Sequence, residues 1–341
     1  MTDSALRARL ASGLVIPALP LALDEFRHWS ERHQRALVRY YIEAGAGGLA
    51  VAVHSTQFEI RLPQHALFEP VLRIAAETMN AHAAPDFVRI AGICGRTEQA
   101  LEEAALAKAL GYHAGLVSPG AWTNASEADF LDHCRIIAGI LPVVGFYLQP
   151  AVGGRVFSYD FWREFAEIEG VAAIKIAPFN RYQTFDVIRA ITDANRTDIA
   201  LYTGNDDAIL TDLLTTWPGG RTIAGGLLGQ WAVWTRRAVE MLDEVKAERR
   251  SPALAAEWLT KNAALTDANA AIFDPANHFH GCIPGILEVL RRQGLVPSAC
   301  CLNPAEHLSP GQAEEITRVS AAYPWLTDDE FVRNGLARWL E

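Results

Sequence analysis

Two kinds of segment alternate along residues 14–248 of this chain. Short, continuous apolar runs, such as residues 48–53 and 142–149, are typical of buried parallel strands, because both faces of such strands are covered. Longer segments with apolar residues at helical spacing, such as 96–110 and 159–168, lie between them. Eight strand–helix pairs fit into this region. The repetition predicts an α/β fold, a closed parallel (β/α)8 TIM barrel.

The pattern changes after residue 249, where it becomes helical throughout. The predicted strands lie, in chain order, at residues 14–20, 48–53, 87–94, 114–119, 142–149, 171–177, 199–204 and 222–226. Predicted helices follow at 253–271, 284–293, 310–322 and 328–340. We therefore expect a barrel catalytic domain at residues 1–248 and a C-terminal helical extension at 249–341. The extension should pack on the barrel, because its helices have apolar faces to bury.

Charge and composition narrow the class of partner. The formal net charge is -10 and basic residues do not cluster, so nucleic acid or an anionic membrane has no electrostatic attraction to the chain. No apolar run approaches the roughly 18 residues that span a bilayer. Five scattered cysteines and an N-terminus without an apolar signal core favour a reducing, cytoplasmic setting. The expected partner is a small molecule.

Lys175 stands out within the apolar run at residues 171–177. Burying an ammonium group costs several kcal/mol unless it is paired, and the usual relief is a lowered pKa that leaves a neutral, nucleophilic amine. Such an amine is what imine-forming catalysis requires. The alternative is a lysine at the mouth of the strand whose amine reaches solvent or a carboxylate.

Other candidate residues lie where predicted strands end, since active sites of such barrels gather at the carboxyl ends of the strands. Tyr147 is either a proton shuttle or a core aromatic. The loop residues His54, Ser55 and Thr56 could hold a carboxylate through hydroxyl and backbone N–H groups. Gly225 and Gly226, at the end of the predicted eighth strand, either let a ligand approach the backbone or allow a tight turn.

Cofactor chemistry has little support in the sequence. His278, His280 and Cys282 can bind metal, but their spacing matches no structural zinc site and they follow the last predicted strand. The glycines form neither GxGxxG nor a P-loop. Residues 204–207 (GNDD) are better suited to capping a helix than to catalysis. We expect no metal and no nucleotide cofactor.

Two short motifs carry a family resemblance. The segment around Tyr147 (residues 146–150, FYLQP) is similar to a Y-N-x-P motif, and the one ending at Lys175 (173–175, AIK) to a G-x-K motif. Their separation, 175 - 147 = 28 residues, is the usual one in the dihydrodipicolinate synthase / N-acetylneuraminate lyase family of class I aldolases, which the chain resembles over about residues 12 to 310.

The resemblance implies a (β/α)8 barrel with a C-terminal helical extension and a homo-oligomer, a tetramer or dimer. It also implies a Schiff base between Lys175 and pyruvate or a related 2-oxo acid. Tyr147 would then relay protons, and the backbone of Ile223 would line the imine. The loop after the second strand would hold the substrate carboxylate.

Three segments depart from the family pattern. Where the family has G-T-T-G-E, the chain reads either 53–57 (VHSTQ) or 54–58 (HSTQF), depending on the alignment. Residues 119–122 (PGAW) replace the family's P-Y-Y, and Val152 replaces an arginine of dihydrodipicolinate synthases. We therefore expect a lyase or aldolase acting on a 2-oxo acid or sugar acid, rather than authentic dihydrodipicolinate synthesis.

Two other classes of function are alternatives to a lyase or aldolase. The altered loop and the missing tyrosine are compatible with a catalytically silent protein that binds a 2-oxo acid or sugar acid on the same scaffold, since a fold does not fix a function. A metal-dependent barrel enzyme is disfavoured, because Asp, Glu and His residues do not group at the strand ends.

Overall fold

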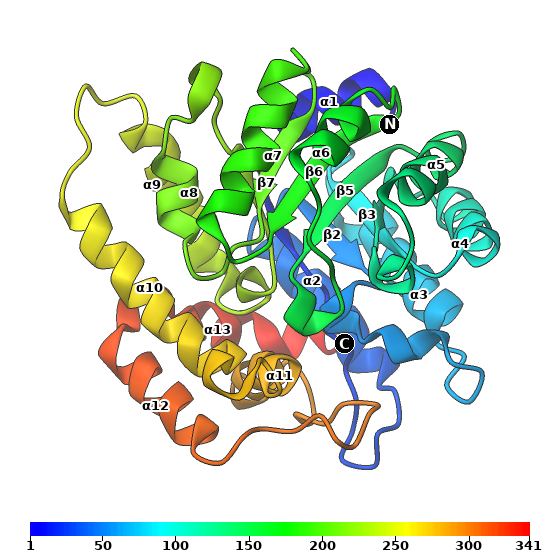
Figure 1. Ribbon diagram of the computed structural model, residues 1–341. Coiled ribbons are helices and arrows are strands. Elements are labelled where there is room, and N and C mark those ends of the chain that lie inside the picture. Colours follow the sequence, from blue (N-terminus) through cyan, green and yellow to red (C-terminus); the bar gives the residue numbers. More distant parts are fainter. The chain divides into compact units, whose positions relative to one another are not determined.

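The computed structural model describes residues 1–341 and contains an eight-stranded parallel sheet with helices between the strands (Figure 1). The strands follow the order β1-β8-β7-β6-β5-β4-β3-β2. They are β1 (Val15–Pro17), β2 (Gly48–Val51), β3 (Val88–Ile93), β4 (Ala114–Val117), β5 (Val143–Leu148), β6 (Val171–Ala177), β7 (Ala200–Thr203) and β8 (Gly225–Leu228).

The two ends of this order also meet. The residues just after β1 pair with β2 through a parallel bridge between Ala18 and Ala50, and Leu19 N donates a hydrogen bond of 2.8 Å to Ala50 O. The sheet therefore closes on itself, and the predicted (β/α)8 TIM barrel is confirmed.

Helices follow the strands as the hydrophobic spacing predicts. They are α2 (Glu31–Glu43), α3 (Phe68–His82), α4 (Thr97–Ala109), α5 (Glu127–Ala138), α6 (Tyr159–Ala166), α7 (Arg181–Asp193), α8 (Ile209–Leu214) and α9 (Thr235–Glu248). The C-terminal helices are α10 (Glu257–Phe273), α11 (Cys282–Arg292), α12 (Gln312–Ala322) and α13 (Asp329–Trp339). Two helices were not predicted, namely α8 and an N-terminal α1 (Asp3–Ala11).

The predicted eighth strand at residues 222–226 is placed too early. In the structure β8 begins at Gly225, so the two glycines open the strand instead of ending it. The cause is a close backbone approach: a Cβ atom on Gly225 would lie 2.3 Å from Leu14 O. Only glycine permits that approach, and it also allows Gly226 N to bond to Leu14 O at 3.1 Å.

The chain divides into two compact units, each discontinuous in sequence. Unit 1 comprises residues 1–14 and 88–227, and unit 2 comprises residues 15–87 and 228–341. Unit 1 therefore holds β3–β7, and unit 2 holds β1, β2 and the C-terminal helices. The domain boundary predicted near residue 248 stays a prediction.

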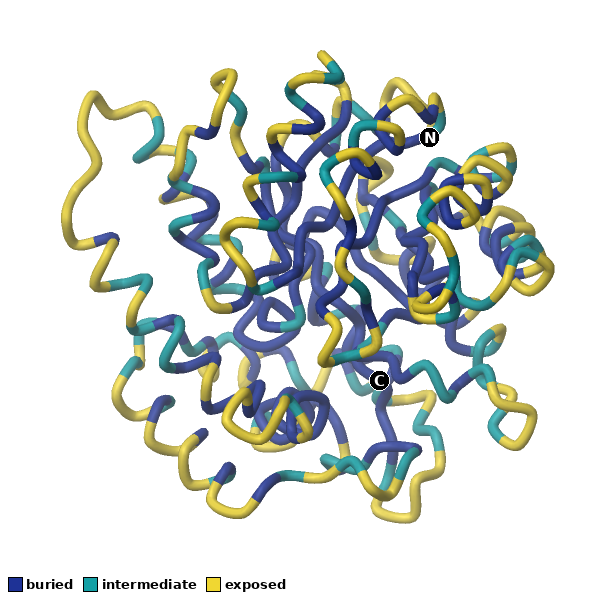
Figure 2. The backbone as a smooth tube through the Cα atoms, in the orientation of Figure 1, coloured by how far each residue is buried: buried dark blue, intermediate teal, exposed yellow.

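Unit 1 has a continuously buried core. Every residue of β6 is buried, and the strands of this unit appear dark blue while the outer helical turns are yellow (Figure 2). Helix α1 is fastened to the amino ends of the strands: Arg7 Nη1 donates to Val171 O at 2.7 Å, and Tyr202 Oη donates to Leu10 O at 2.7 Å. This contact fixes the start of the strand that carries Lys175.

Unit 2 joins the C-terminal helices to the first helix of the barrel. Tyr40 of α2 donates to Asp328 Oδ2 at 2.7 Å, just before α13, and Arg39 donates to Trp339 O at 2.5 Å. Helices α10, α11 and α12 pack against one another, coloured yellow to red in Figure 1. None of the helices combines the length and the apolar character that crossing a bilayer requires.

Candidate active site

Lys175 is the fifth residue of β6 and is buried, with 8% of its surface exposed. Its Nζ lies 4.5 Å from the ring centroid of Phe146, which the β5–β6 register pairs with it. An aromatic face attracts a cation but cannot accept its proton as a carboxylate could. The amine therefore lies beside an aromatic ring, on a strand whose residues are all buried.

Gly204, just after β7, makes room for the lysine chain. A Cβ atom on Gly204 would lie 2.8 Å from Lys175 Cε and 2.7 Å from Ala177 Cβ, closer than such contacts ever occur. Gly204 N also donates to Ile176 O at 2.7 Å, which extends the pairing of β6 and β7 beyond the strand. The backbone of Gly204 thus lies directly against the aliphatic part of Lys175.

The structure does not place Tyr147 beside Lys175. Tyr147 pairs with Ile176 in the β5–β6 register, and alternate residues of a strand point to opposite faces of the sheet. Its ring packs against Trp162 of α6, with 5.2 Å between the ring centroids. Its hydroxyl is bonded to the backbone of Phe157, accepting from N at 3.3 Å and donating to O at 3.4 Å.

The Tyr147 hydroxyl is thus engaged with Phe157, and its proton-relay role stays a prediction. Gly145, two residues earlier, faces the same helix, since a Cβ atom there would lie 2.7 Å from the Phe165 ring. Burial raises the pKa of Tyr147 to about 12, so the phenol stays neutral at physiological pH. The spacing of 28 residues pointed to this pair, but spacing alone does not determine strand register.

The loop after β2 uses its hydroxyl groups to hold the backbone. Ser55 Oγ donates to Ala18 O at 2.9 Å, and Thr56 Oγ1 donates to Leu19 O at 2.6 Å. Both residues are buried, while His54 is half-buried and lies 5.9 Å from Phe58, ring to ring. The hydroxyl protons predicted to bind a substrate carboxylate are thus already donated to backbone carbonyls.

Gln57 decides between the two alignments of this loop. It has φ +67°, in the region that favours glycine. This supports the alignment in which Gln57 stands opposite the second glycine of G-T-T-G-E, and Ser55 and Thr56 opposite the threonine pair. The Gln57 side chain is buried, and its Oε1 accepts from Leu302 N at 2.6 Å.

Ile223 and Gly226, the two candidates from the predicted eighth strand, lie in different places relative to β8. Ile223 is buried but precedes β8, so it lies at the amino end of that strand, away from the carboxyl ends where such barrels do their chemistry. The role predicted for its backbone assumed a strand that begins at residue 222, and it stays a prediction. Gly226 lies within β8 and pairs with Thr203 of β7.

Sequence reasoning missed a buried polar cluster next to Gly204. Asn205 was expected to belong to a helix cap, but α8 begins after Ala208 and its N-cap makes no side-chain hydrogen bond. Instead Asn205 Nδ2 donates to Asp212 Oδ2 at 2.9 Å, and the Asp212 carboxylate is fully buried. Burial raises the pKa of Asp212, which Arg181 and two hydrogen bonds oppose. An aspartate between the leucines of a short helix carries no sequence signal of burial.

Metal-capable residues do not gather in the structure. No group of three or more His, Cys, Asp or Glu side chains has the geometry to hold an ion. His280 instead contacts His307 edge to face, with 5.2 Å between the ring centroids.

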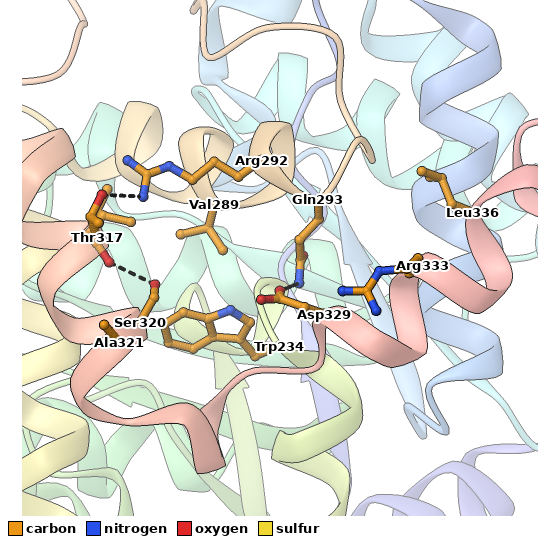
Figure 3. Close-up of a pocket in the computed structure, with 11 residues that line it drawn as sticks. Trp234, Val289, Arg292, Gln293, Thr317, Ser320, Ala321, Asp329, Arg333 and Leu336 are labelled. Atoms are coloured by element: carbon orange, nitrogen blue, oxygen red, sulfur yellow. Dashed lines mark hydrogen bonds between the residues drawn. The ribbon is translucent and has the colours of Figure 1, made fainter.

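A groove of about 620 Å³ lies among α11, α12 and α13 in unit 2 (Figure 3). Trp234, Val289 and Leu336 supply apolar surface to it. Its polar groups bond to other protein groups: Arg292 donates to Thr317 at 2.9 Å, and Gln293 donates to Asp329 at 2.8 Å. Because these bonds serve the packing of the C-terminal helices, the groove does not compete with Lys175 as the site of chemistry.

The fold and the site define a class: a (β/α)8 barrel with C-terminal helices and a buried lysine in the middle of its sixth strand. Residues 11–320 match the Dihydrodipicolinate synthetase family, and the chain belongs to that family. Proteins of this family are lyases and aldolases, which supports an enzyme of that kind.

Individual relatives agree with this assignment. The chain is 28% identical to N-acetylneuraminate lyase 2 of Escherichia coli O6:H1 over 237 residues, which cover 69% of this chain and 74% of that protein. The N-acetylneuraminate lyase of Fusobacterium nucleatum, solved with pyruvate, superposes with a TM-score of 0.73 at 18% identity, covering 92% of this chain and 98% of that one. The dihydrodipicolinate synthase of Oceanobacillus iheyensis gives 0.73 at 16% identity, covering 95% and 99%. The last two likenesses concern the fold alone.

Proposed function

We propose that this protein is a Schiff-base lyase or aldolase in which Lys175 condenses with the ketone of a 2-oxo acid. The observation that carries the proposal is the burial of Lys175 on β6 among Phe146 and aliphatic neighbours. A lysine is retained in such a setting only at a cost, and nucleophilic catalysis is the chemistry that uses a desolvated amine.

The proposed reaction follows from the amine. Lys175 Nζ attacks the carbonyl carbon, the carbinolamine loses water, and an iminium ion forms. The C4 hydroxyl of the substrate then loses its proton, the bond between C3 and C4 breaks, and the iminium accepts the electron pair of that bond, which leaves an enamine and an aldehyde. Protonation of the enamine at C3 and hydrolysis of the iminium then release the shortened 2-oxo acid and restore the amine. Bond formation is the same sequence in reverse.

The substrate class is a 2-oxo acid or a sugar-acid derivative. Its support is the match to an N-acetylneuraminate lyase and the replacement of an arginine of dihydrodipicolinate synthases by Val152. The Ser55 and Thr56 hydroxyls donate to the backbone, and the N–H groups of Val53, Thr56 and Gln57 donate within the loop. We therefore propose that the backbone N–H groups of His54 and Ser55 hold the carboxylate. We also propose that the protein forms a homo-oligomer in the cytoplasm and binds neither nucleic acid nor membranes.

A second candidate is a catalytically silent protein that binds the same acids. The observation that favours it is the orientation of Tyr147, whose hydroxyl is bonded to Phe157 instead of facing Lys175. Such a protein would bind acids tightly without breaking a carbon–carbon bond.

Borohydride trapping separates these possibilities. The chain has only four lysines, so peptide mapping identifies the modified one directly. We expect incubation with pyruvate and sodium borohydride to add one reduced pyruvate at Lys175 and none at the exposed Lys108. Trapping together with cleavage of N-acetylneuraminate or another sugar acid supports the enzyme. Tight binding of an acid without turnover, with Lys175 unreactive, supports the silent protein, and no adduct with any 2-oxo acid would count against the Schiff-base enzyme.

A further inference from the structure

Gly204, whose backbone lies against Lys175, is held from both sides by one carboxylate oxygen. Thr203, the residue before it, donates its hydroxyl to Asp212 Oδ2 at 2.6 Å. Asn205, the residue after it, donates Nδ2 to the same oxygen at 2.9 Å. Asn205 N also donates to Thr203 Oγ1 at 3.1 Å. The peptide units around Gly204 are therefore fastened to a single point on α8.

The Asn205 side chain also fastens the loop that follows the lysine strand. Its Oδ1 accepts from Phe179 N at 3.0 Å, two residues beyond the end of β6, and its Nδ2 donates to Thr184 Oγ1 of α7 at 3.0 Å. Phe179 has φ +51°, which a non-glycine residue adopts only when its surroundings hold it there. One amide thus joins the carboxyl ends of β6 and β7.

Asp212 holds this arrangement from inside the protein. Its carboxylate is fully buried and accepts from Thr203, Asn205 and the Arg181 guanidinium. All three partners are donors, so an amide at this position would turn its own N–H groups toward at least one of them. The carboxylate is specifically required here, and isosteric replacement by asparagine disturbs the cluster without leaving a cavity.

We propose that Asn205 and Asp212 are positioning residues that hold Gly204 against the aliphatic chain of Lys175 and thereby fix the amine for attack on the substrate carbonyl. The proposal rests on the proposed Schiff-base function and adds residues that do not touch the substrate. A lysine side chain has four flexible carbons, and contact at Cγ and Cε limits the directions its amine can take. A displacement of about 1 Å at a reacting atom can cost roughly 10²-fold in rate.

The test compares Asn205→Ala and Asp212→Asn with a matched variant at the other end of the same strand. Asp198 precedes β7 and accepts from Arg7 at 2.7 Å and from Arg196 at 2.8 Å. Asp198→Asn therefore makes the same chemical change in the same unit, far along the strand from Lys175. Each protein is assayed for melting temperature, for kcat and KM, and for the rate of borohydride trapping with pyruvate.

We expect Asn205→Ala and Asp212→Asn to lower kcat and the trapping rate by about 10- to 100-fold with KM changed less than about threefold. Asp198→Asn should leave kcat and trapping within about twofold of wild type, whatever its melting temperature. If Asn205→Ala or Asp212→Asn fails to fold, Thr184→Val removes one bond to Asn205 at nearly constant volume and should lower trapping about threefold.

Two results would overturn the inference, and each differs from a failure of the proposed function. Lower melting temperatures with unchanged kcat and trapping would reduce the cluster to a structural role. Equal losses in all three variants would mean that general destabilisation causes the effect. If wild type itself forms no adduct at Lys175, the proposed function has failed instead.

Discussion

The end of β6 and the loop after β2 both carry polar side chains that the sequence predicts to be functional. In the structure these side chains have different surroundings. Lys175 Nζ lies over the ring of Phe146, and the backbone of Gly204 lies against the aliphatic part of the lysine side chain. In the loop after β2, Ser55 and Thr56 both donate to backbone carbonyls close to β1. We propose that the first region uses its polar group for chemistry, whereas the hydroxyl groups of the second hold the backbone.

The difference shows what makes a polar residue a functional candidate. A hydroxyl has one proton, and once this is donated to a buried carbonyl its removal costs stability. Burying a lysine in an apolar strand costs free energy, so its presence there supports the proposed catalytic role. Three substitutions test this comparison.

The largest effect is expected at Lys175. Lys175→Met approximates the length of the aliphatic part of the side chain but removes the amine. Trapping should therefore vanish, and turnover should fall by about 10³-fold or more. The measurement is kcat/KM with the best sugar-acid substrate, together with intact mass after borohydride treatment. Lys108→Met is the matched control, because that lysine is exposed on α4. Turnover that survives in Lys175→Met would remove the lysine from the mechanism.

A smaller effect, on stability, is expected at Thr56. Thr56→Val removes the hydrogen bonds that join the Thr56 hydroxyl to Leu19 O and Val53 N, which should lower the free energy of unfolding by about 2 kcal/mol. Thr327→Val removes an exposed bond to Pro324 O and should cost less than about 0.5 kcal/mol. Urea titration measures both. A Thr56→Val protein of normal stability whose KM for pyruvate rises tenfold would return the hydroxyl to the substrate site.

The smallest effect is expected at Tyr147. Tyr147→Phe removes two long hydrogen bonds to Phe157 and should cost about 1 kcal/mol with kcat within about threefold of wild type. A fall in kcat of about 10²-fold at unchanged stability would instead restore the proton-relay role.

The phenol also has a pH signature. Its folded pKa of about 12 is above its ordinary value of 10, so its contribution to stability is complete below pH 10 and is lost as the pH rises toward 12. In that window wild type should lose stability with pH more steeply than Tyr147→Phe. Denaturant titrations at pH 9 and 11 compare the two slopes.

Much of the fold follows from the sequence because it depends on local pattern. Continuous apolar runs mark buried parallel strands, and the run around Lys175 coincides with β6 from first residue to last. The (β/α)8 barrel and the four C-terminal helices follow from the same reasoning. The start of β8 was predicted wrongly at the glycine pair 225–226. Glycine is needed there because of the close approach of Leu14, which lies far away in the sequence.

The candidate site is less predictable, because it depends on which way side chains point. The lysine could be found from type and setting alone. Its companion could not, because the register of β5 and β6 places Phe146 at its side and turns Tyr147 toward α6. Asp212 was missed for a similar reason, since only the packing of α8 on β7 reveals that its carboxylate is buried.

Helix α1 gives the lysine strand an anchor at the end opposite the chemistry. Arg7 donates a hydrogen bond to Val171 O, the first carbonyl of β6, and Tyr202 of the neighbouring β7 donates its hydroxyl to Leu10 O. Removing residues 1–12 would delete both hydrogen bonds and expose the buried first residues of β6, Val171 and Ala172, to water. The shortened protein should retain Lys175 and the residues around it and still be inactivated by mild warming.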